Sequence, residues 1–260
     1  MKQYIVDAFT SELFEGNPAA VCIMDDWISD KMMQNIAAEN NLSDTAFAVK
    51  ENEKYKLRWF TPGGEINLCG HATLATAYVL MNYVEKQWQS VTFDTMKGEI
   101  TVNRRGDLYE IDFPAFEIEP VEISESLINA LGATPKEAYL GRDLLCVFED
   151  ESVVRNLSPD MDKLMNLEGL MVHVTAKGKD NDCVSRSFGP KLDIPEDPVC
   201  GSGHCHIIPY WMKKAGKEKL IGYQASKRGG KLYCSMAGNR VIISGKAVLF
   251  SIAELYMAKN

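Results

Sequence analysis

Two cysteines, Cys69 and Cys200, each stand directly before a glycine and before a long apolar segment that is predicted to be a helix. At the start of a helix, unpaired backbone N–H groups and the positive end of the helix dipole converge. We therefore expect each thiol to have a lowered pKa, and the N–H groups to bind a carboxylate. Gly70 and Gly201 would let that ligand approach the backbone closely. If both helix ends face one cleft, a thiol lies on each face of one carbon, as a two-base proton transfer requires.

The two cysteines belong to longer sequence strings that occur once in each half of the chain. Residues 58–72 and residues 186–203 both read R-x-F-x-P followed by E-x-x-[LV]-C-G-x-[AG], about half of the 260-residue chain apart. Downstream of each string lies an alternating stretch with a turn glycine, at 98–109 and 229–241, which is typical of a β-hairpin. The shared order of segments predicts an internal duplication.

The elements expected around these strings are also paired. Helices are predicted from Ser29 to about Glu39 and from Ser158 to about Leu167, because each begins with a capping residue. The apolar stretches after the two Cys-Gly pairs are predicted to be buried helices, and short strands follow the capped helices. These expectations cover residues 71–83 and 202–214 for the buried helices, and residues 45–49 and 170–174 for the strands.

The predicted fold class is α+β, with two pseudo-symmetric halves, each a curved mixed sheet wrapped around a central helix. The predicted domains are residues 1–118 and residues 119–260. The last predicted strand, residues 247–256, can pair with either half.

Composition excludes several classes of function. The chain has 28 basic and 36 acidic residues, a net charge of −8, and therefore lacks the basic surface that a nucleic-acid partner requires. No apolar segment has the length of a membrane span or a signal peptide, so we expect no membrane partner and a cytoplasmic location. Seven cysteines in a chain of this size favour reduced thiols over a disulfide scaffold.

Other interpretations of the cysteines remain open. Either one alone is typical of a small buried residue at a turn, and a Cys69–Cys200 disulfide would require an oxidising compartment. Zinc binding would draw on a set of four residues near the second helix start, but the first half has no equivalent ligands and the chain has no C-x-x-C pair. We therefore expect no metal, and the absence of a phosphate-binding glycine motif predicts no other cofactor. The zinc candidates are Cys200, His204, Cys205 and His206, and the cysteines expected to be structural are Cys22, Cys146, Cys183 and Cys234.

Five strings spread over residues 6–211 together resemble the PhzF-like (phenazine biosynthesis-like) family. They read VDAFTSELFEGNPAAV, AAENNLSDTAF, LRWFTPGGEINLCGHATLATA, VSRSFGP and EDPVCGSGHCHIIPYW. The resemblance implies the diaminopimelate epimerase fold, a homodimer, and cofactor-independent isomerisation of a small carboxylic acid.

The resemblance also implies roles for single residues. Asp44 falls where the family commonly has a glutamate acid/base, one methylene longer. Cys69 and Cys200 fall where the epimerases have two catalytic thiols, whereas many PhzF-like proteins have threonine at the second position. The residues implied in substrate binding are Gly70, His71, Asp197, Gly201, Ser202 and Gly203.

Structural interpretations of these positions are also consistent with the sequence. Asp44 follows Ser43 in a predicted turn, where an aspartate commonly caps backbone N–H groups. His71 is typical of a hydrogen-bonded core histidine, and Asp197, before Pro198, is typical of a turn.

Three hypotheses for function follow. The first is a cofactor-independent racemase or epimerase that moves a proton at a carbon beside a carboxylate with its two thiols. The second is a PhzF-type double-bond isomerase in which Asp44 transfers the proton. The third, from another class, is a protein that binds small carboxylates without turnover.

Overall fold

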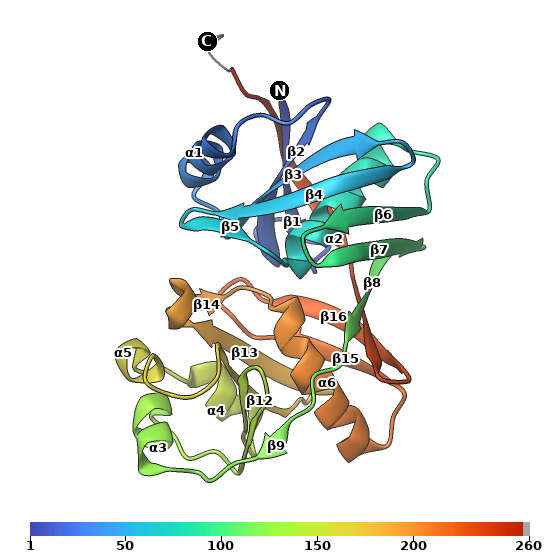
Figure 1. Cartoon of the computed structure of the whole chain (residues 1–260). Helices are drawn as coiled ribbons and strands as arrows, with labels where there is room; N and C mark the ends of the chain where they lie inside the picture. The colour runs from blue at the N-terminus through green and yellow to red at the C-terminus, as the bar shows by residue number, and fades with distance from the viewer. Residues whose placement is uncertain (257–260) are drawn as a thin grey trace. The chain divides into compact units, whose positions relative to one another are not determined.

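The duplicated sequence strings correspond to duplicated strand pairings in the computed structural model, which describes residues 1–256 (Figure 1). The chain divides into two compact units. The first unit comprises residues 1–112 and the chain from Ser244 onward, and the second comprises residues 113–243. The last strand of the predicted C-terminal half therefore belongs to the first unit.

The first unit is built on a mixed sheet. Strand β2 runs parallel to β3, β3 pairs antiparallel with β4, and β4 runs parallel to β6, which continues into the antiparallel strands β7 and β8. Its strands are β1 (Lys2–Ala8), β2 (Asn17–Met24), β3 (Asp44–Glu51), β4 (Lys54–Thr61), β5 (Gly64–Ile66), β6 (Ser90–Thr95), β7 (Gly98–Arg105), β8 (Leu108–Pro114) and β18 (Ala247–Glu254). Its helices are α1 (Asp30–Asn40), α2 (Gly70–Val79) and the π-helix η1 (Leu80–Val84).

The second unit repeats this order of pairings. Strand β11 runs parallel to β12, β12 pairs antiparallel with β13, and β13 runs parallel to β15, which pairs antiparallel with β16. Its strands are β9 (Glu119–Pro120), β10 (Glu137–Leu140), β11 (Leu144–Val147), β12 (Val172–Lys177), β13 (Cys183–Gly189), β14 (Ile194–Asp197), β15 (Lys219–Gln224), β16 (Gly230–Ala237) and β17 (Arg240–Gly245). Its helices are α3 (Glu125–Leu131), α4 (Glu151–Asn156), α5 (Met161–Leu164), the 3-10 helix η2 (Pro190–Leu192) and α6 (Gly201–Ala215).

A buried helix lies at the centre of each unit, as the apolar stretches after the Cys-Gly pairs predict (Figure 1). Helix α2 contacts β1, β2, β3, β7 and β18, and almost all of its side chains are buried because its sequence, GHATLATAYV, has no charged face. Helix α6 contacts β12, β15 and β16 and ends at Gly216, whose φ of 63° suits a left-handed cap. The predicted α+β class with a central helix in each half is confirmed.

The last strand completes the first unit. Strand β18 pairs antiparallel with β1 along its whole length, from Lys2 opposite Glu254 to Ala8 opposite Ala247. In the second unit the two-residue strand β9 pairs with β10 in the matching position. The sequence left open which half the final strand pairs with, and the structure pairs it with the first.

An arginine–glutamate ion pair explains why the string R-x-F-x-P…E occurs twice. Arg58 binds Glu65 across the β4–β5 hairpin through Nε and Nη2, at 2.6 and 2.7 Å, and its guanidinium lies over the Phe60 ring. In the second unit Arg186 binds Glu196 in the same two-pronged way, at 2.7 and 3.0 Å, and lies over Phe188. The string therefore fixes the hairpin that leads into each Cys-Gly pair.

Of the two helices predicted from capping residues, one forms as predicted and the other does not. Helix α1 begins after Ser29, whose hydroxyl accepts a hydrogen bond from the N–H of Met32, as predicted. The expected helix from Ser158 to Leu167 is wrong, because only Met161–Leu164 is helical and its cap is Asp160. The helical segment is a single turn of four residues that packs against α3, and a helix this short depends on such packing.

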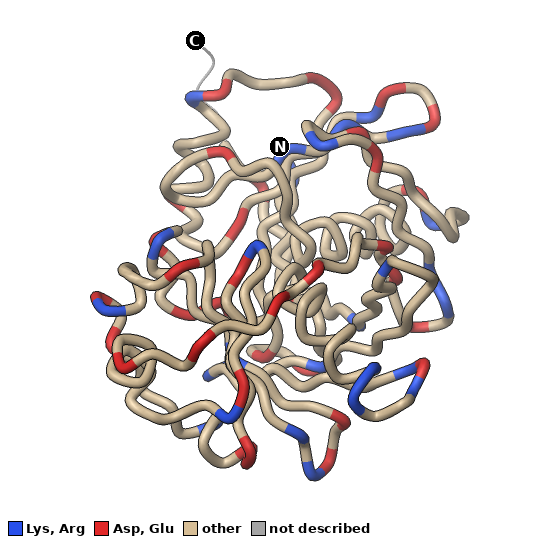
Figure 2. Tube along the Cα trace, turned by 60° about the horizontal axis from the view of Figure 1, so that its bottom comes forward, with Lys and Arg blue, Asp and Glu red and all other residues tan. Residues whose placement is uncertain are grey.

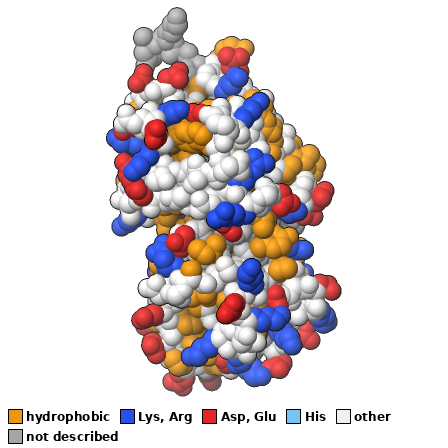
Figure 3. All heavy atoms as spheres, turned by 90° about the vertical axis from the view of Figure 1, so that its right-hand side faces the viewer, with side chains coloured by type: hydrophobic (Ala, Val, Ile, Leu, Met, Phe, Trp, Pro, Cys, Tyr) orange, Lys and Arg blue, Asp and Glu red, His pale blue; other side chains and the backbone are white. Residues whose placement is uncertain are grey.

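The described surface mixes opposite charges. Figure 2 shows basic and acidic residues interspersed along the trace, and Figure 3 shows a face on which hydrophobic side chains lie among charged ones. All seven cysteines are free thiols. Among residues 1–256, every helix is too short or too polar to cross a membrane.

Candidate active site

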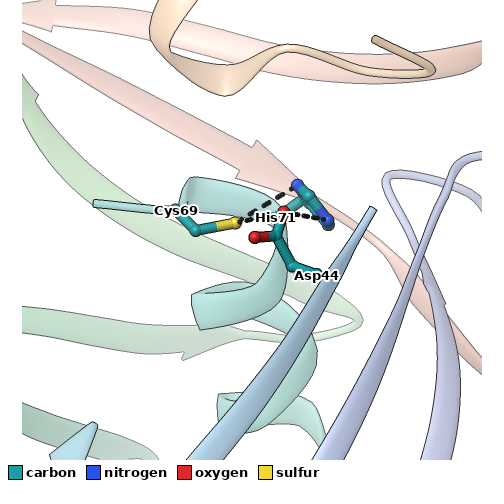
Figure 4. Close-up of side chains that lie close together, drawn as sticks. All are labelled: Asp44, Cys69 and His71. Atoms are coloured by element: carbon teal, nitrogen blue, oxygen red, sulfur yellow. Dashed lines mark hydrogen bonds and ion pairs between the residues drawn. The ribbon is translucent and has the colours of Figure 1, made fainter. Parts of the chain in front are cut away.

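Three side chains with acid/base chemistry meet at the start of α2 in the first unit (Figure 4). The Cys69 thiol donates to Asp44 Oδ2 at 3.2 Å, and its sulfur lies 3.4 Å from Nδ1 of His71. Nε2 of His71 lies 3.4 Å from Asp44 Oδ2. All three residues are buried, so the cluster holds three proton-carrying groups in direct contact and sheltered from water.

Local structure explains how these side chains come together. Asp44 is the first residue of β3 and follows a left-handed turn at Asn41, which ends α1. The turn is held by Asn40, whose amide donates to the Thr45 hydroxyl at 3.0 Å. Cys69 has extended backbone and is the N-cap of α2, so its side chain stands at the helix start beside His71.

Burial governs the protonation of His71. The loss of water around the ring lowers the pKa of His71 to about 3, so the imidazole is neutral near pH 7 and has one donor and one acceptor nitrogen. Nε2 makes no hydrogen bond with any residue that the structure describes, although it lies 3.4 Å from Asp44 Oδ2.

The start of α6 in the second unit carries a different set of groups. The Cys200 sulfur accepts a hydrogen bond from the N–H of Gly203 at 3.4 Å and lies 3.5 Å from the Ser202 hydroxyl. Gly201 is the first residue of the helix. Asp197 caps the preceding turn, since its Oδ1 accepts from the N–H of Val199 at 3.1 Å.

The expected lowering of the thiol pKa is wrong for Cys200. Burial, reinforced by the negative charge of Asp197, raises the pKa of Cys200 well above its ordinary value. The hydrogen bonds from Ser202 and Gly203 act in the opposite direction but are weaker. Desolvation of the thiolate therefore outweighs the helix terminus at this position.

Strand register shows which residues of the two units are equivalent. Thr45 is opposite Phe60, and Val172 is opposite Phe188, the matching phenylalanine of the repeated string. Asp44 directly precedes Thr45, and Met171 directly precedes Val172 and the start of β12, so Met171 is the counterpart of Asp44. Counting from the two N-cap cysteines makes Ser202 the counterpart of His71. The second unit thus repeats the thiol but neither the carboxylate nor the imidazole.

Two groups of residues have the geometry to share a metal ion, since their ligand atoms lie within 4.8 Å of one another. These groups are Asp44 with Cys69 and His71, and Asp143 with His173 and His206. The zinc set considered from the sequence has separate hydrogen-bond partners instead: His204 Nδ1 contacts the Cys200 carbonyl at 2.7 Å, and Cys205 donates to the Gly201 carbonyl.

The sequence pattern missed a buried polar network in the second unit. Asp143 Oδ2 accepts from Arg142 and lies 3.0 Å from His173 Nε2, and His173 Nδ1 lies 3.0 Å from the Ser187 hydroxyl. Arg142 also donates to Ser202 at 3.0 Å. The signal in the sequence is the difference between the two repeats, because the network consists of polar residues at positions where the first unit is largely apolar.

Comparison with known proteins agrees with this architecture. Residues 6–253 match the model of a protein family described as "Phenazine biosynthesis-like protein". An uncharacterized isomerase of Pseudomonas aeruginosa is 46% identical over 252 residues, covering 97% of both chains. The crystal structure of a PhzF-family phenazine biosynthesis protein from Enterococcus faecalis superimposes with a TM-score of 0.97 at 50% identity, covering 98% of this chain and 99% of that one.

A more distant structure shares the fold alone. A hydroxyproline epimerase from Agrobacterium vitis aligns over 97% of this chain and 91% of its own, with a TM-score of 0.64 and 11% identity. The fold and the relatives define an enzyme of the isomerase class. The chain belongs to the phenazine biosynthesis-like family.

Proposed function

We propose that this protein is a cofactor-independent isomerase that moves a proton at a carbon near the carboxylate of a small acid or amino acid. The observation that supports the proposal is the contact of Asp44, Cys69 and His71 at the start of α2. A carboxyl group in contact with a thiol and a neutral imidazole can take up a proton and pass it on without a metal or an organic cofactor.

The proposed reaction starts with Asp44 as general base. Its carboxylate takes the proton from the substrate carbon, and the electron pair of the broken C–H bond moves into the adjacent carboxylate or conjugated double bond. The first N–H groups of α2 have no partner within the helix and would stabilise the negative charge that develops. The proton then returns from the Asp44 carboxyl group, or through Cys69 and His71, to a different carbon or a different face.

The asymmetry of the two units favours Asp44 over the pair of thiols as the proton carrier. The two-thiol hypothesis needs Cys200 to ionise, and burial raises the pKa of that thiol. The counterpart of Asp44 in the second unit is a methionine, which cannot carry a proton. The matched Cys-Gly pairs remain the observation in favour of the two-thiol hypothesis.

The proposal is tested by proton exchange. Small amino acids, hydroxy acids and unsaturated carboxylic acids are incubated with the protein in D2O, and deuterium uptake at carbon is followed by proton NMR. We expect uptake at one carbon of at least one acid, with the same result after dialysis against EDTA. Uptake that vanished after dialysis and returned with zinc would overturn the cofactor-independent mechanism, and a complete absence of uptake would favour the binding protein.

A further inference from the structure

We propose that Arg142 and Ser202 form a carboxylate-binding site in the second unit, and that the buried chain Asp143–His173–Ser187 exists to hold Arg142 in position. The inference rests on the proposed function in one respect, namely that the bound carboxylate is the carboxylate of the substrate. All of the residues that form the site lie within the second unit.

The guanidinium of Arg142 is fixed on one side and open on the other. Its Nε and Nη2 donate to Asp143, Nη2 also donates to the Ser202 hydroxyl at 3.0 Å, and the group lies 4.7 Å above the Phe116 ring. Nη1 makes no hydrogen bond or ion pair with the residues that the structure describes. The side chain is 32% exposed, so a ligand can reach the remaining N–H groups.

A second arginine of the same unit shows what a purely structural guanidinium looks like. Arg186 donates through Nε and Nη2 to Glu196, and its Nη1 donates to the backbone carbonyls of Leu157 and Val154. Each of its three nitrogens therefore has a protein acceptor. Arg142 also binds a carboxylate through Nε and Nη2, here through the single oxygen Oδ2 of Asp143, and it also lies over a phenylalanine ring. Its third nitrogen, Nη1, is left for another acceptor, such as an oxygen of a bound carboxylate.

The residues beneath Arg142 are polar and completely buried. The side chains of Asp143, His173 and His206 have no exposed surface. Although burial opposes ionisation, His173 and Arg142 hold the pKa of Asp143 below its usual range, so it remains a carboxylate. Oδ1 of Asp143 also accepts from the N–H of Met171 at 3.3 Å. An ionised group at this depth is costly to desolvate, and its hydrogen bonds offset that cost.

The first unit shows that the fold does not need this network. Strand register and distance from the N-cap cysteine give each member an equivalent in the first unit, and none of the equivalents is charged. The equivalents are Ala19 for Asp143, Ala46 for His173, Trp59 for Ser187 and Ala75 for His206. Because apolar residues build the same strands and helix, we assign the polar set to the positioning of Arg142.

A single glycine makes room for the network. A Cβ atom on Gly203 would lie 2.6 Å from Cε1 of His173, too close for any real contact. The first unit has Ala72 at the matching position and Ala46 in place of the histidine. The second unit has therefore exchanged two alanines for a glycine and a histidine that fit together.

The test measures binding of benzoate, with benzamide as its uncharged analogue, by NMR titration of the intact protein. We expect benzoate to saturate the wild type with a Kd of about 10 mM or below. Arg142→Gln should weaken benzoate roughly 10- to 100-fold, the range for a hydrogen bond to a charged group, and leave benzamide unchanged. Arg142→Lys should retain part of the affinity, because it keeps the positive charge but loses the planar guanidinium that Asp143 and Ser202 hold in place.

Two further variants keep the test decisive. Arg155→Gln is the matched control, because Arg155 is also half-exposed, lies over the Tyr223 ring and pairs with Glu151, and this variant should bind benzoate as the wild type does. The double variant His173→Ala with Gly203→Ala restores the alanine pair of the first unit, and circular dichroism checks its folding, since Asp143 loses its contact with His173. It should weaken benzoate several-fold, because Arg142 loses its support.

Equal affinity of Arg142→Gln and wild type for benzoate would overturn the proposal, as would the absence of saturable binding to the wild type or an equal loss of benzamide binding. Binding needs no turnover. A failure of the proposed isomerase reaction would leave these affinities unchanged, so the two failures can be told apart.

Discussion

The two units of this protein place different side chains on the same scaffold. Each begins its central helix at a Cys-Gly pair, and each fixes the preceding hairpin with an arginine–glutamate pair. In the first unit the cysteine meets a carboxylate and an imidazole, whereas in the second it meets a serine and a methionine. The difference shows that a duplicated backbone constrains the hairpin and the helix start, but leaves the groups beside the thiol free to diverge.

The packing of the central helices diverges in the same way. Thr73 and His204 are equivalent, and both contact the carbonyl of the N-cap cysteine, through Oγ1 at 2.5 Å and through Nδ1 at 2.7 Å. The backbone acceptor is thus satisfied in both units by different side chains. Buried polar groups are tolerated where each finds a partner, and the choice of partner sets the local titration behaviour.

The largest expected effect separates Asp44 from Cys200. Asp44→Asn keeps the size of the side chain but cannot cycle a proton, so the exchange rate in D2O should fall roughly 10²-fold or more. Cys200→Ala should keep most of the rate, because the residue equivalent to Asp44 beside Cys200 is Met171, which cannot carry a proton. The measurement is kcat for deuterium uptake, with folding checked by circular dichroism.

Asp44→Glu is the matched control, since it restores the longer acid that the family resemblance implies, and it should retain turnover. Near-normal kcat for Asp44→Asn beside inactive Cys69→Ala and Cys200→Ala would establish the two-thiol mechanism instead.

The second prediction concerns the fit of Gly203 against His173. Gly203→Ala should lower the free energy of unfolding by about 1–3 kcal/mol, because the new methyl group overlaps the imidazole. In the His173→Ala background the same change should be neutral or stabilising, since alanine favours a helix by about 1 kcal/mol over glycine. Urea denaturation of the four proteins of this double-mutant cycle gives the coupling energy, and additive effects would contradict the proposed contact.

The third prediction concerns acid stability. Burial lowers the pKa of His71 to about 3 and that of His204 and His206 to about 4, from 6.5 in each case. Below pH 6.5 these histidines are protonated in the unfolded chain but stay neutral in the folded protein. The free energy of unfolding should therefore fall as the pH drops from about 6.5 towards 4.

His204→Thr places the residue of the first unit in the second and keeps a donor for the Cys200 carbonyl. It should reduce the slope of stability against pH by about 1 kcal/mol per pH unit within that window. Urea midpoints at several pH values measure the slope, and an unchanged slope would mean that His204 is not neutral in the folded protein.

The smallest expected effect is at the Cys200 thiol. Because burial raises its pKa, native Cys200 should react with iodoacetamide no faster than Cys146, whose pKa burial raises to about 12. Mass-spectrometric mapping after alkylation at neutral pH compares the two. Much faster alkylation of Cys200, with protection by a carboxylate, would contradict this prediction and favour the two-thiol hypothesis.

The sequence by itself determined the duplication, the two buried central helices and the isomerase family. These features depend on short-range patterns, namely apolar runs, turn glycines and a repeated string, and such patterns are visible along the chain. The sequence also identified Asp44, Cys69 and His71 as candidates, although through resemblance and a local motif rather than through their contacts.

Only the tertiary structure decided which candidates meet and how they titrate. Asp44 and Cys69 come together because β3 begins beside the start of α2, a proximity that no local pattern contains. The sequence predicted a lowered pKa for Cys200 because a helix dipole can be inferred from sequence, whereas the desolvation that outweighs it depends on every neighbouring atom. The network beneath Arg142 was missed for the same reason, since its members come from the turn before β11, from two strands and from α6, and share a site only after folding.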